Sequence, residues 1–345
     1  VSAIPLLIAL LADHPDIHRD AAGALWSLAD DSNNQKLIAG ENGIPPIVEL
    51  LRTPSGLTPR RAALRGRAQE TAAGALHSLA ARGENRTIIA DVGGITLLIP
   101  LFDGGTDMAK IETEGALLTL AIDHPSNQYI IASKLVNMLA AGPSDASEAT
   151  NAAAISRLEA NEWAVKVIYK LTLNRDNKDA LSRTPAISQL VRQLKGGSEE
   201  CQKLSSDALT QIARMSGELR IQVTQQLVTL LRNPNPDVRQ RAGFVLRDMN
   251  EGNGEDSKHQ KEAAMAGGGG PLVELLRDGL KNERVEAQEY ALWSLSMAAD
   301  AKRAGLMVRE GLVAPLIQSL NGAQLGVNAQ EYGAFVLSCL ALDRN

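Results

Sequence analysis

Apolar residues recur along this chain at helical spacing, and one twelve-residue pattern returns throughout its length. Residues 17–28 read IHRDAAGALWSL, residues 68–79 read AQETAAGALHSL, and residues 109–120 read AKIETEGALLTL. Small and aliphatic side chains lie three and four residues apart in each copy, which places them on one face of an α-helix. Five further copies end at residues 171, 212, 249, 298 and 340. The copies are 37 to 51 residues apart, which indicates a repeat protein with a period near 41.

A second pattern precedes most of these helices. Residues 34–51 read NQKLIAGENGIPPIVELL, and residues 85–102 read NRTIIADVGGITLLIPLF. This pattern predicts a short first helix, a turn, and a second helix before the long third helix. We expect glycine to end the short helix with a positive φ, at Gly43, Gly94 and Gly311. We expect proline in the first turn of the second helix, at Pro45, Pro271 and Pro315.

The phrase N-x-x-x-I-x-x-x-G-I-P-P-I-V-x-L-L followed by Q-E-x-A-A-x-A-L-x-S-L resembles the armadillo repeat, over essentially all of the chain. Residues 234–249 (PNPDVRQRAGFVLRDM) are closer to the related HEAT repeat. The resemblance implies an all-α fold: a right-handed α-solenoid of about eight three-helix repeats, each contacting only its neighbours. It also implies one solenoid domain over residues 1–345, with inserts near residues 53–67, 140–160 and 250–261.

Composition supports a helical, aliphatic core. Hydrophobic residues make up 44% of the chain, but only three Phe, three Trp and four Tyr are present. Ala and Leu favour helices, and the rarity of period-two alternation disfavours a β-sandwich or barrel. The net charge of −5 argues against a nucleic acid partner, since such proteins usually present a basic face.

Neither a membrane span nor a disulfide framework is predicted. The longest uncharged apolar run, residues 3–12, is ten residues long, whereas a spanning helix needs about 20. Cys201 and Cys339 are the only cysteines. Nothing therefore indicates an oxidising compartment, and we expect a cytoplasmic protein.

The two ends of the chain have no obvious polar cap in the sequence. Ile4, Leu7 and Leu10 lie near one end, and Leu337 and Leu340 lie near the other. Terminal repeats of a complete solenoid carry a polar outer face. We therefore expect either a fragment or processed chain, or a larger assembly that covers the ends.

The sequence contains no recognisable catalytic arrangement. Among the histidines, only His14 and His18 have the spacing of a helical metal pair, and Pro15 between them disrupts it. The run AGGGGP at residues 266–271 lacks the preceding strand and following lysine of a phosphate loop. We expect no catalytic residues, no bound metal and no cofactor.

The third helices are the expected binding surface, because the resemblance implies that they line a concave groove. The seventh residue of each twelve-residue pattern would face a partner; these residues are Gly23, Gly74, Gly115, Lys166, Asp207, Phe244, Trp293 and Phe335. Importin-α-like members carry a Trp–Asn ladder there, and its absence argues against a nuclear-import receptor.

We expect this stripe to be bare in the first three repeats, basic in the middle and aromatic in the last three. The predicted groove residues are Phe244, Trp293, Phe335, Lys166, Lys170 and Met297. The alternative is that the aromatic side chains pack against the adjacent third helix. Trp26 and Trp163 lie off the stripe and are expected in the core.

The insert at residues 53–67 (TPSGLTPRRAALRGR) carries Arg60, Arg61, Arg65 and Arg67 without an acid. It is predicted as a basic docking loop for a phosphate or an acidic peptide. The simpler alternative is a solvated loop with no ligand. Residues 140–160 read as a small-residue linker that becomes helical near its end, and residues 250–261 as a Gly-rich charged loop.

These patterns favour a non-enzymatic scaffold that is similar to beta-catenin-like and vacuolar armadillo adaptors. Such a protein would bind a segment of a partner protein along its concave groove. One alternative is a structural bridging subunit of a large ciliary or photosynthetic assembly. Another is a HEAT-like accessory protein of the bilin lyase type, against which the dominance of the armadillo pattern argues.

Overall fold

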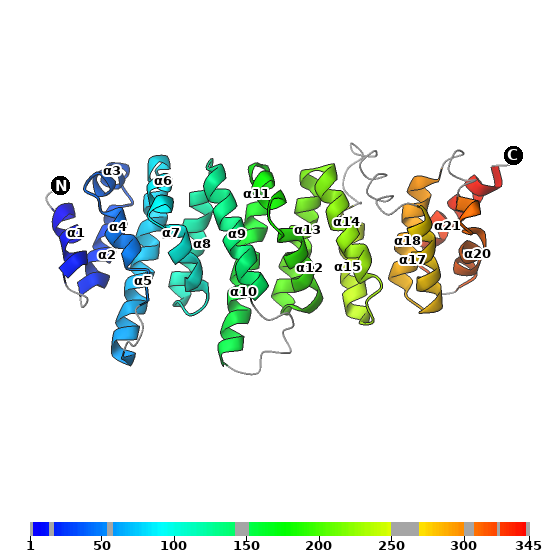
Figure 1. Cartoon of the computed structure of the whole chain (residues 1–345), viewed down its shortest axis with the longest axis horizontal. Coiled ribbons are helices and arrows are strands. Elements are labelled where there is room, and N and C mark those ends of the chain that lie inside the picture. Colours follow the sequence, from blue (N-terminus) through cyan, green and yellow to red (C-terminus); the bar gives the residue numbers. More distant parts are fainter. Residues whose placement is uncertain are drawn as a thin grey trace. The chain divides into compact units, whose positions relative to one another are not determined.

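The computed structural model describes residues 3–13, 17–53, 58–141, 152–249, 269–299, 307–322 and 325–342. Every regular element in these ranges is a helix (Figure 1), so the all-α prediction is confirmed. The contacts divide the chain into two compact units, Val1–Gln189 and Leu190–Asn345. Each unit is described by itself, and a single continuous solenoid over residues 1–345 stays a prediction.

The first unit is a series of helical repeats. The first repeat contains α1 (Ala3–Asp13) and α2 (His18–Leu28); the second contains α3 (Ser32–Gly40), α4 (Ile44–Glu49) and α5 (Pro59–Ala80). The third contains α6 (Gly83–Asp91), α7 (Gly94–Leu98) with the 3-10 turn η2 (Ile99–Phe102), and α8 (Asp107–Ala121). The fourth contains α9 (Pro125–Ala141) and α10 (Ala152–Thr172), and η4 (Arg175–Asn177) and α11 (Lys178–Ser182) begin the fifth. The third helices α2, α5, α8 and α10 contact one another in sequence order.

The second unit repeats the same arrangement. Its helices are α13 (Glu199–Met215), α14 (Gly217–Leu230), α15 (Pro236–Asp248), α17 (Gly269–Lys281), α18 (Val285–Ala298), α20 (Val313–Asn321) and α21 (Val327–Leu342), and the boundary between the units falls within α12 (Ala186–Gly196). The third helices α13, α15, α18 and α21 again contact one another in order. Each unit is therefore built by stacking neighbouring repeats, as a solenoid is.

Two repeats differ from the predicted three-helix pattern. In the fourth and sixth repeats, single helices, α9 and α14, take the place of separate first and second helices. Neither helix contains Gly or Pro after its first residue, whereas Gly43 and Pro45 separate α3 from α4. Without those residues nothing breaks the helix, so it continues.

An asparagine closes the end of each third helix in the first unit; it is part-buried at Asn34 and buried at the other three positions. The last carbonyl groups of a helix have no partner within the helix and need one elsewhere. The amide of Asn85 donates to the Leu79 carbonyl at 3.0 Å, and that of Asn177 donates to the Leu171 carbonyl at 2.9 Å. The same bond recurs at 3.0 Å from Asn34 to Leu28 and from Asn127 to Leu120. The asparagine that starts each first-helix pattern therefore locks consecutive helices together.

The predicted glycine conformation is correct at one of three positions. Gly311 has φ +77°, but the positive φ in the earlier turns belongs to Asn42 (φ +56°) and Gly93 (φ +85°). Gly43 is required for another reason: a Cβ there would lie 2.8 Å from the Ile8 side chain and 2.9 Å from a backbone oxygen. The prediction for the prolines is confirmed, since the first turns of the second helices α4, α17 and α20 contain Pro45, Pro271 and Pro315, respectively.

The inserts differ in structure. Residues 59–67 form the first turns of α5 rather than a loop, because Thr58 and Pro59 provide a helix start and the following residues are helix formers. Residues 152–160 are helical at the start of α10, as expected, whereas residues 142–151 lie outside the described ranges. The insert at residues 250–261 also lies outside them.

Candidate functional site

The aromatic residues predicted for the groove lie on successive third helices of the second unit. Phe244 is on α15, Trp293 on α18 and Phe335 on α21, at the same position of the repeat. Phe244 is 52% exposed and Phe335 is 51% exposed, although the chain has only three phenylalanines. Trp293 is half-buried. We refer to Phe244, Trp293 and Phe335 as the aromatic row.

Trp293 is half-buried because it packs on its own helix. Its ring centroid lies 5.8 Å from that of Tyr290, one turn earlier, with the planes tilted by 34°. Tyr290 is buried, which raises the pKa of its hydroxyl to about 12, although a hydrogen bond with Ser294 opposes the shift. Trp293 therefore contacts a buried, neutral tyrosine of its own helix. The alternative, that the aromatic side chains pack against the adjacent third helix, stays a prediction. Met297, one turn beyond Trp293, is also half-buried.

Charged groups lie at the Phe244 end of the aromatic row. The Arg247 guanidinium lies 5.6 Å from the centre of the Phe244 ring, within cation–π range. On the neighbouring helix α13, Asp207 occupies the position equivalent to Phe244. Burial raises the pKa of the Asp207 carboxyl, which Lys203 lowers and the nearby acids Asp248 and Glu200 raise further. This end of the row therefore combines an exposed aromatic ring with charged neighbours.

The first unit uses its aromatic rings differently. The Trp26 ring lies directly over Gly74 of the next third helix, so a Cβ on Gly74 would come within 2.6 Å of the ring. In the same way the His77 ring covers Gly115, where a Cβ would lie 2.7 Å from His77 Nδ1. The prediction of a bare surface is therefore wrong at Gly74 and Gly115, because a side chain from the preceding repeat fills each space. At Gly23 a Cβ would make only an ordinary contact, 3.7 Å from Thr71.

Trp26 and Trp163 are half-buried rather than core residues. The Trp163 ring stacks on the buried Phe102 ring at a centroid distance of 5.8 Å and an interplanar angle of 8°. The Lys166 ammonium group lies 4.3 Å from the centre of the Trp163 ring. Trp163 therefore packs on the edge of the core and also faces a surface lysine.

The two predicted groove lysines are paired within the protein. Lys166 Nζ lies 2.8 Å from one carboxylate oxygen of Glu114, and Lys170 Nζ lies 2.5 Å from the other. The Glu114 side chain is only 7% exposed. These ion pairs join α8 to α10 and partly neutralise the lysines, so the lysines are weaker attractants for an acidic partner than the sequence indicates. Both lysines belong to the first unit, whereas the aromatic row belongs to the second.

The four arginines of the insert have two different roles. Arg65 donates hydrogen bonds to the backbone carbonyls of Arg52 at 2.7 Å and Glu49 at 2.9 Å, and so closes the end of α4. Burial lowers the pKa of Arg65, which the Glu49 carboxylate opposes. Arg60, Arg61 and Arg67 are exposed. No carboxylate of a described residue pairs with them.

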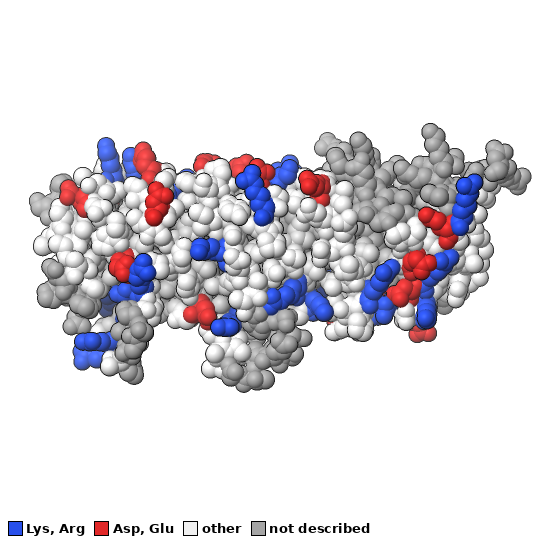
Figure 2. Space-filling view, viewed as in Figure 1, with Lys and Arg blue, Asp and Glu red and all other residues white. Residues whose placement is uncertain are grey.

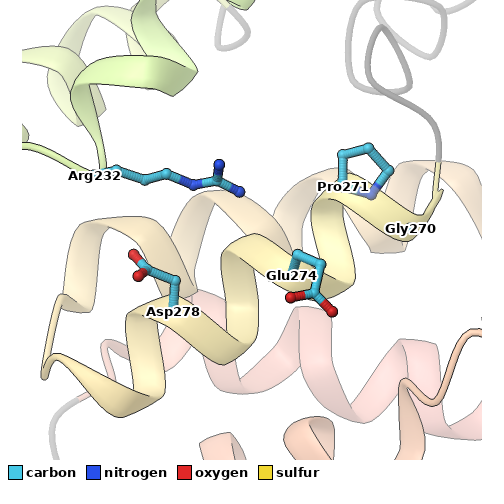
Figure 3. A pocket seen from close by; sticks show the side chains of 5 residues that line it. All are labelled: Arg232, Gly270, Pro271, Glu274 and Asp278. Atoms are coloured by element: carbon cyan, nitrogen blue, oxygen red, sulfur yellow. The ribbon is translucent and has the colours of Figure 1, made fainter.

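One open hollow of about 610 Å³ is lined by Arg232, Gly270, Pro271, Glu274 and Asp278 (Figure 3). Its acids are already paired: Glu274 contacts Arg277, and Asp278 lies 2.7 Å from Arg284. Both carboxylates of this hollow are therefore engaged by arginines. Within the described residues no cluster of three or more His, Cys, Asp or Glu could hold a metal ion. His14, whose pairing with His18 as metal ligands is disfavoured by Pro15, lies outside those residues.

In the part of the chain that the structure describes, no single helix is long and apolar enough to cross a membrane. One pair of short helices, Gly83–Asp91 and Gly94–Phe102, passes the same test of length and composition together but is bent by 70°.

Several solved structures are similar to this chain. A designed armadillo repeat protein is 21% identical over 72% of this chain and 100% of its own, with a TM-score of 0.44. Two engineered proteins of the Northeast Structural Genomics Consortium are 20% identical: one covers 72% of this chain and 96% of its own with a TM-score of 0.45, and the other covers 98% of both with a TM-score of 0.35. No family model matches the sequence, and no curated protein matches it. The assignment to an all-α protein of armadillo-like repeats therefore depends on its own helices.

Proposed function

We propose that this chain is a non-enzymatic protein-interaction module whose aromatic row binds a segment of a partner protein. The exposure of Phe244 and Phe335 carries this proposal, since each presents about half of its surface to solvent. Exposed aromatic side chains in a row are unfavourable in water and are enriched among residues that dominate binding energy. Enzymatic chemistry has no comparable support among the described side chains.

The row determines what kind of segment would bind. Its residues belong to three successive repeats, so the partner segment needs apolar side chains that recur along its length. Arg247 beside Phe244 would favour an acidic residue near one of these side chains. An amphipathic helix or an extended segment with alternating apolar residues has this pattern.

A peptide-display library panned against the intact chain tests the proposal. Peptides that bind through the row should lose affinity at least about tenfold, or 1.4 kcal/mol, when Phe244→Ala or Phe335→Ala is introduced. Ile317→Ala on α20 is the matched control, because Ile317 is 47% exposed but lies on a second helix. Equal losses in all three variants, or no loss in the phenylalanine variants, would contradict the proposal.

A further inference from the structure

The first turns of α5 carry arginines without acids. Between Glu49 and Glu70 the chain carries five arginines and no acid, and without these five its net charge would be −5 − 5 = −10. Arg52 is paired with the Glu49 carboxylate at 2.7 Å, and Arg65 closes α4. Arg60, Arg61 and Arg67 remain free; we refer to these three as the arginine extension.

Two residues of the arginine extension lie where positive charge is unfavourable for helix stability. The N-terminus of an α-helix carries a partial positive charge, which favours acids in the first turn. Five of the other third helices follow this rule, α2, α8, α13, α15 and α18, with Asp20, Asp107, Glu199, Asp237 and Glu286. The third helices α10 and α21 have neither an acid nor an arginine in their first turn. Helix α5 instead has Arg60 and Arg61 in its first turn and no acid. A local arrangement that weakens its own helix points to a role outside folding.

Two of the three arginines, Arg60 and Arg67, lie on the side of α5 that carries Gly74, whereas Arg61 lies about 140° away around the helix. Arg67 and Arg60 lie 7 and 14 residues before Gly74, and a helix drifts only about 20° per seven residues. Both therefore lie within about 40° of the face on which Trp26 covers Gly74. Figure 1 shows this end of α5 reaching beyond α2 and α8, and Figure 2 shows basic side chains without neighbouring acids at its tip.

We propose that the arginine extension binds an acidic segment of a partner protein, with carboxylates held by the guanidinium groups of Arg60, Arg61 and Arg67. Guanidinium and carboxylate groups form paired, charge-assisted hydrogen bonds. A nucleic acid fits less well, because its affinity depends on many phosphate contacts and the remainder of this chain is acidic. This site is independent of the aromatic row and lies in the first unit.

A fluorescent ten-residue peptide of glutamates separated by serines, titrated against the intact chain at low salt, tests the proposal. The double variant Arg60→Glu/Arg61→Glu should bind it at least about tenfold more weakly. The same variant should melt at an equal or higher temperature, since it places acids in the first turn of α5. Loss of binding with retained or increased stability separates a ligand site from a structural role.

The control is Lys36→Glu/Arg183→Glu, which makes the same change in net charge at two exposed positions of the first unit. It should change the affinity less than about twofold. Three results would overturn the proposal: no binding of the peptide to the unmodified chain, equal losses in the two double variants, or tighter binding of a ten-nucleotide RNA that Arg60→Glu/Arg61→Glu also abolishes.

Discussion

Both units carry aromatic rings on their third helices, but at different positions of the repeat. The position decides whether the ring packs against the next repeat or is exposed to solvent. In the first unit, Trp26 and His77 occupy the tenth position of the repeat and lie over Gly74 and Gly115 of the next third helix. In the second unit, Phe244 and Phe335 occupy the seventh position, where the first three repeats of the first unit have glycine, and remain half exposed. A ring over a glycine joins two repeats. A ring in place of the glycine stays available to a partner.

Charge follows a similar division within the first unit. Lys166 and Lys170 lie at predicted groove positions, but the buried Glu114 pairs with both. His77 contacts Glu112, with Nδ1 and the carboxylate oxygen 2.9 Å apart. Arg60, Arg61 and Arg67 of the arginine extension, by contrast, pair with no carboxylate of a described residue, which is why the extension supports the proposed binding site.

The largest expected effect is at Gly74. Gly74→Ala should lower the free energy of unfolding by about 1–3 kcal/mol, because the new Cβ would displace the Trp26 ring. Gly23→Ala is the matched control; its Cβ has room, so it should raise the free energy of unfolding by about 0.5–1 kcal/mol. Urea unfolding followed by circular dichroism measures both. If both changes stabilise the protein equally, the packing of Trp26 on Gly74 does not contribute to the stability of the two repeats.

Trp293 should show an effect on binding that exceeds its effect on stability. Trp293→Ala removes a half-buried ring that packs on Tyr290, so affinity for a selected peptide should fall at least about tenfold, or 1.4 kcal/mol. The free energy of unfolding should fall by less than the binding free energy does, and so well below the roughly 3–5 kcal/mol typical of a fully buried aromatic side chain. Binding and thermal unfolding measured on the same sample decide. A full loss of stability with unchanged affinity would make Trp293 a core residue.

The smallest effect is expected at the paired lysines. Lys166→Met removes one of the two cations that contact Glu114, while Lys170 remains. The free energy of unfolding should fall by no more than about 1 kcal/mol, because both lysines are partly exposed to solvent. Lys36→Met, at an exposed lysine on α3, should be neutral. A loss for Lys166→Met well above 2 kcal/mol would show that this ion pair is far more important than its exposure indicates.

The helical repeats could be predicted from the sequence because the third-helix copies repeat the same apolar spacing and several of them are preceded by the same Gly and Pro positions. Thr58 followed by Pro59 is a typical helix N-terminus, so the start of α5 could have been predicted even though the insert as a whole resembles a loop. The ion pair between Glu114 and Lys166 could not be predicted from the sequence, since the two residues are 52 positions apart. The packing of the Trp26 ring over Gly74 was not predicted. It depends on how α2 and α5 are aligned along their axes, and the sequence pattern does not determine that alignment.

The central claim, that the aromatic row of the second unit is the binding surface, can be tested with the three tryptophans of the chain. Fluorine NMR of the protein labelled with 5-fluorotryptophan gives one signal for each of Trp26, Trp163 and Trp293, assigned by Trp→Phe variants. On titration with a peptide selected from the display library, the account predicts that the Trp293 signal shifts while those of Trp26 and Trp163 stay in place. A shift of the Trp26 or Trp163 signal with an unchanged Trp293 signal would contradict it.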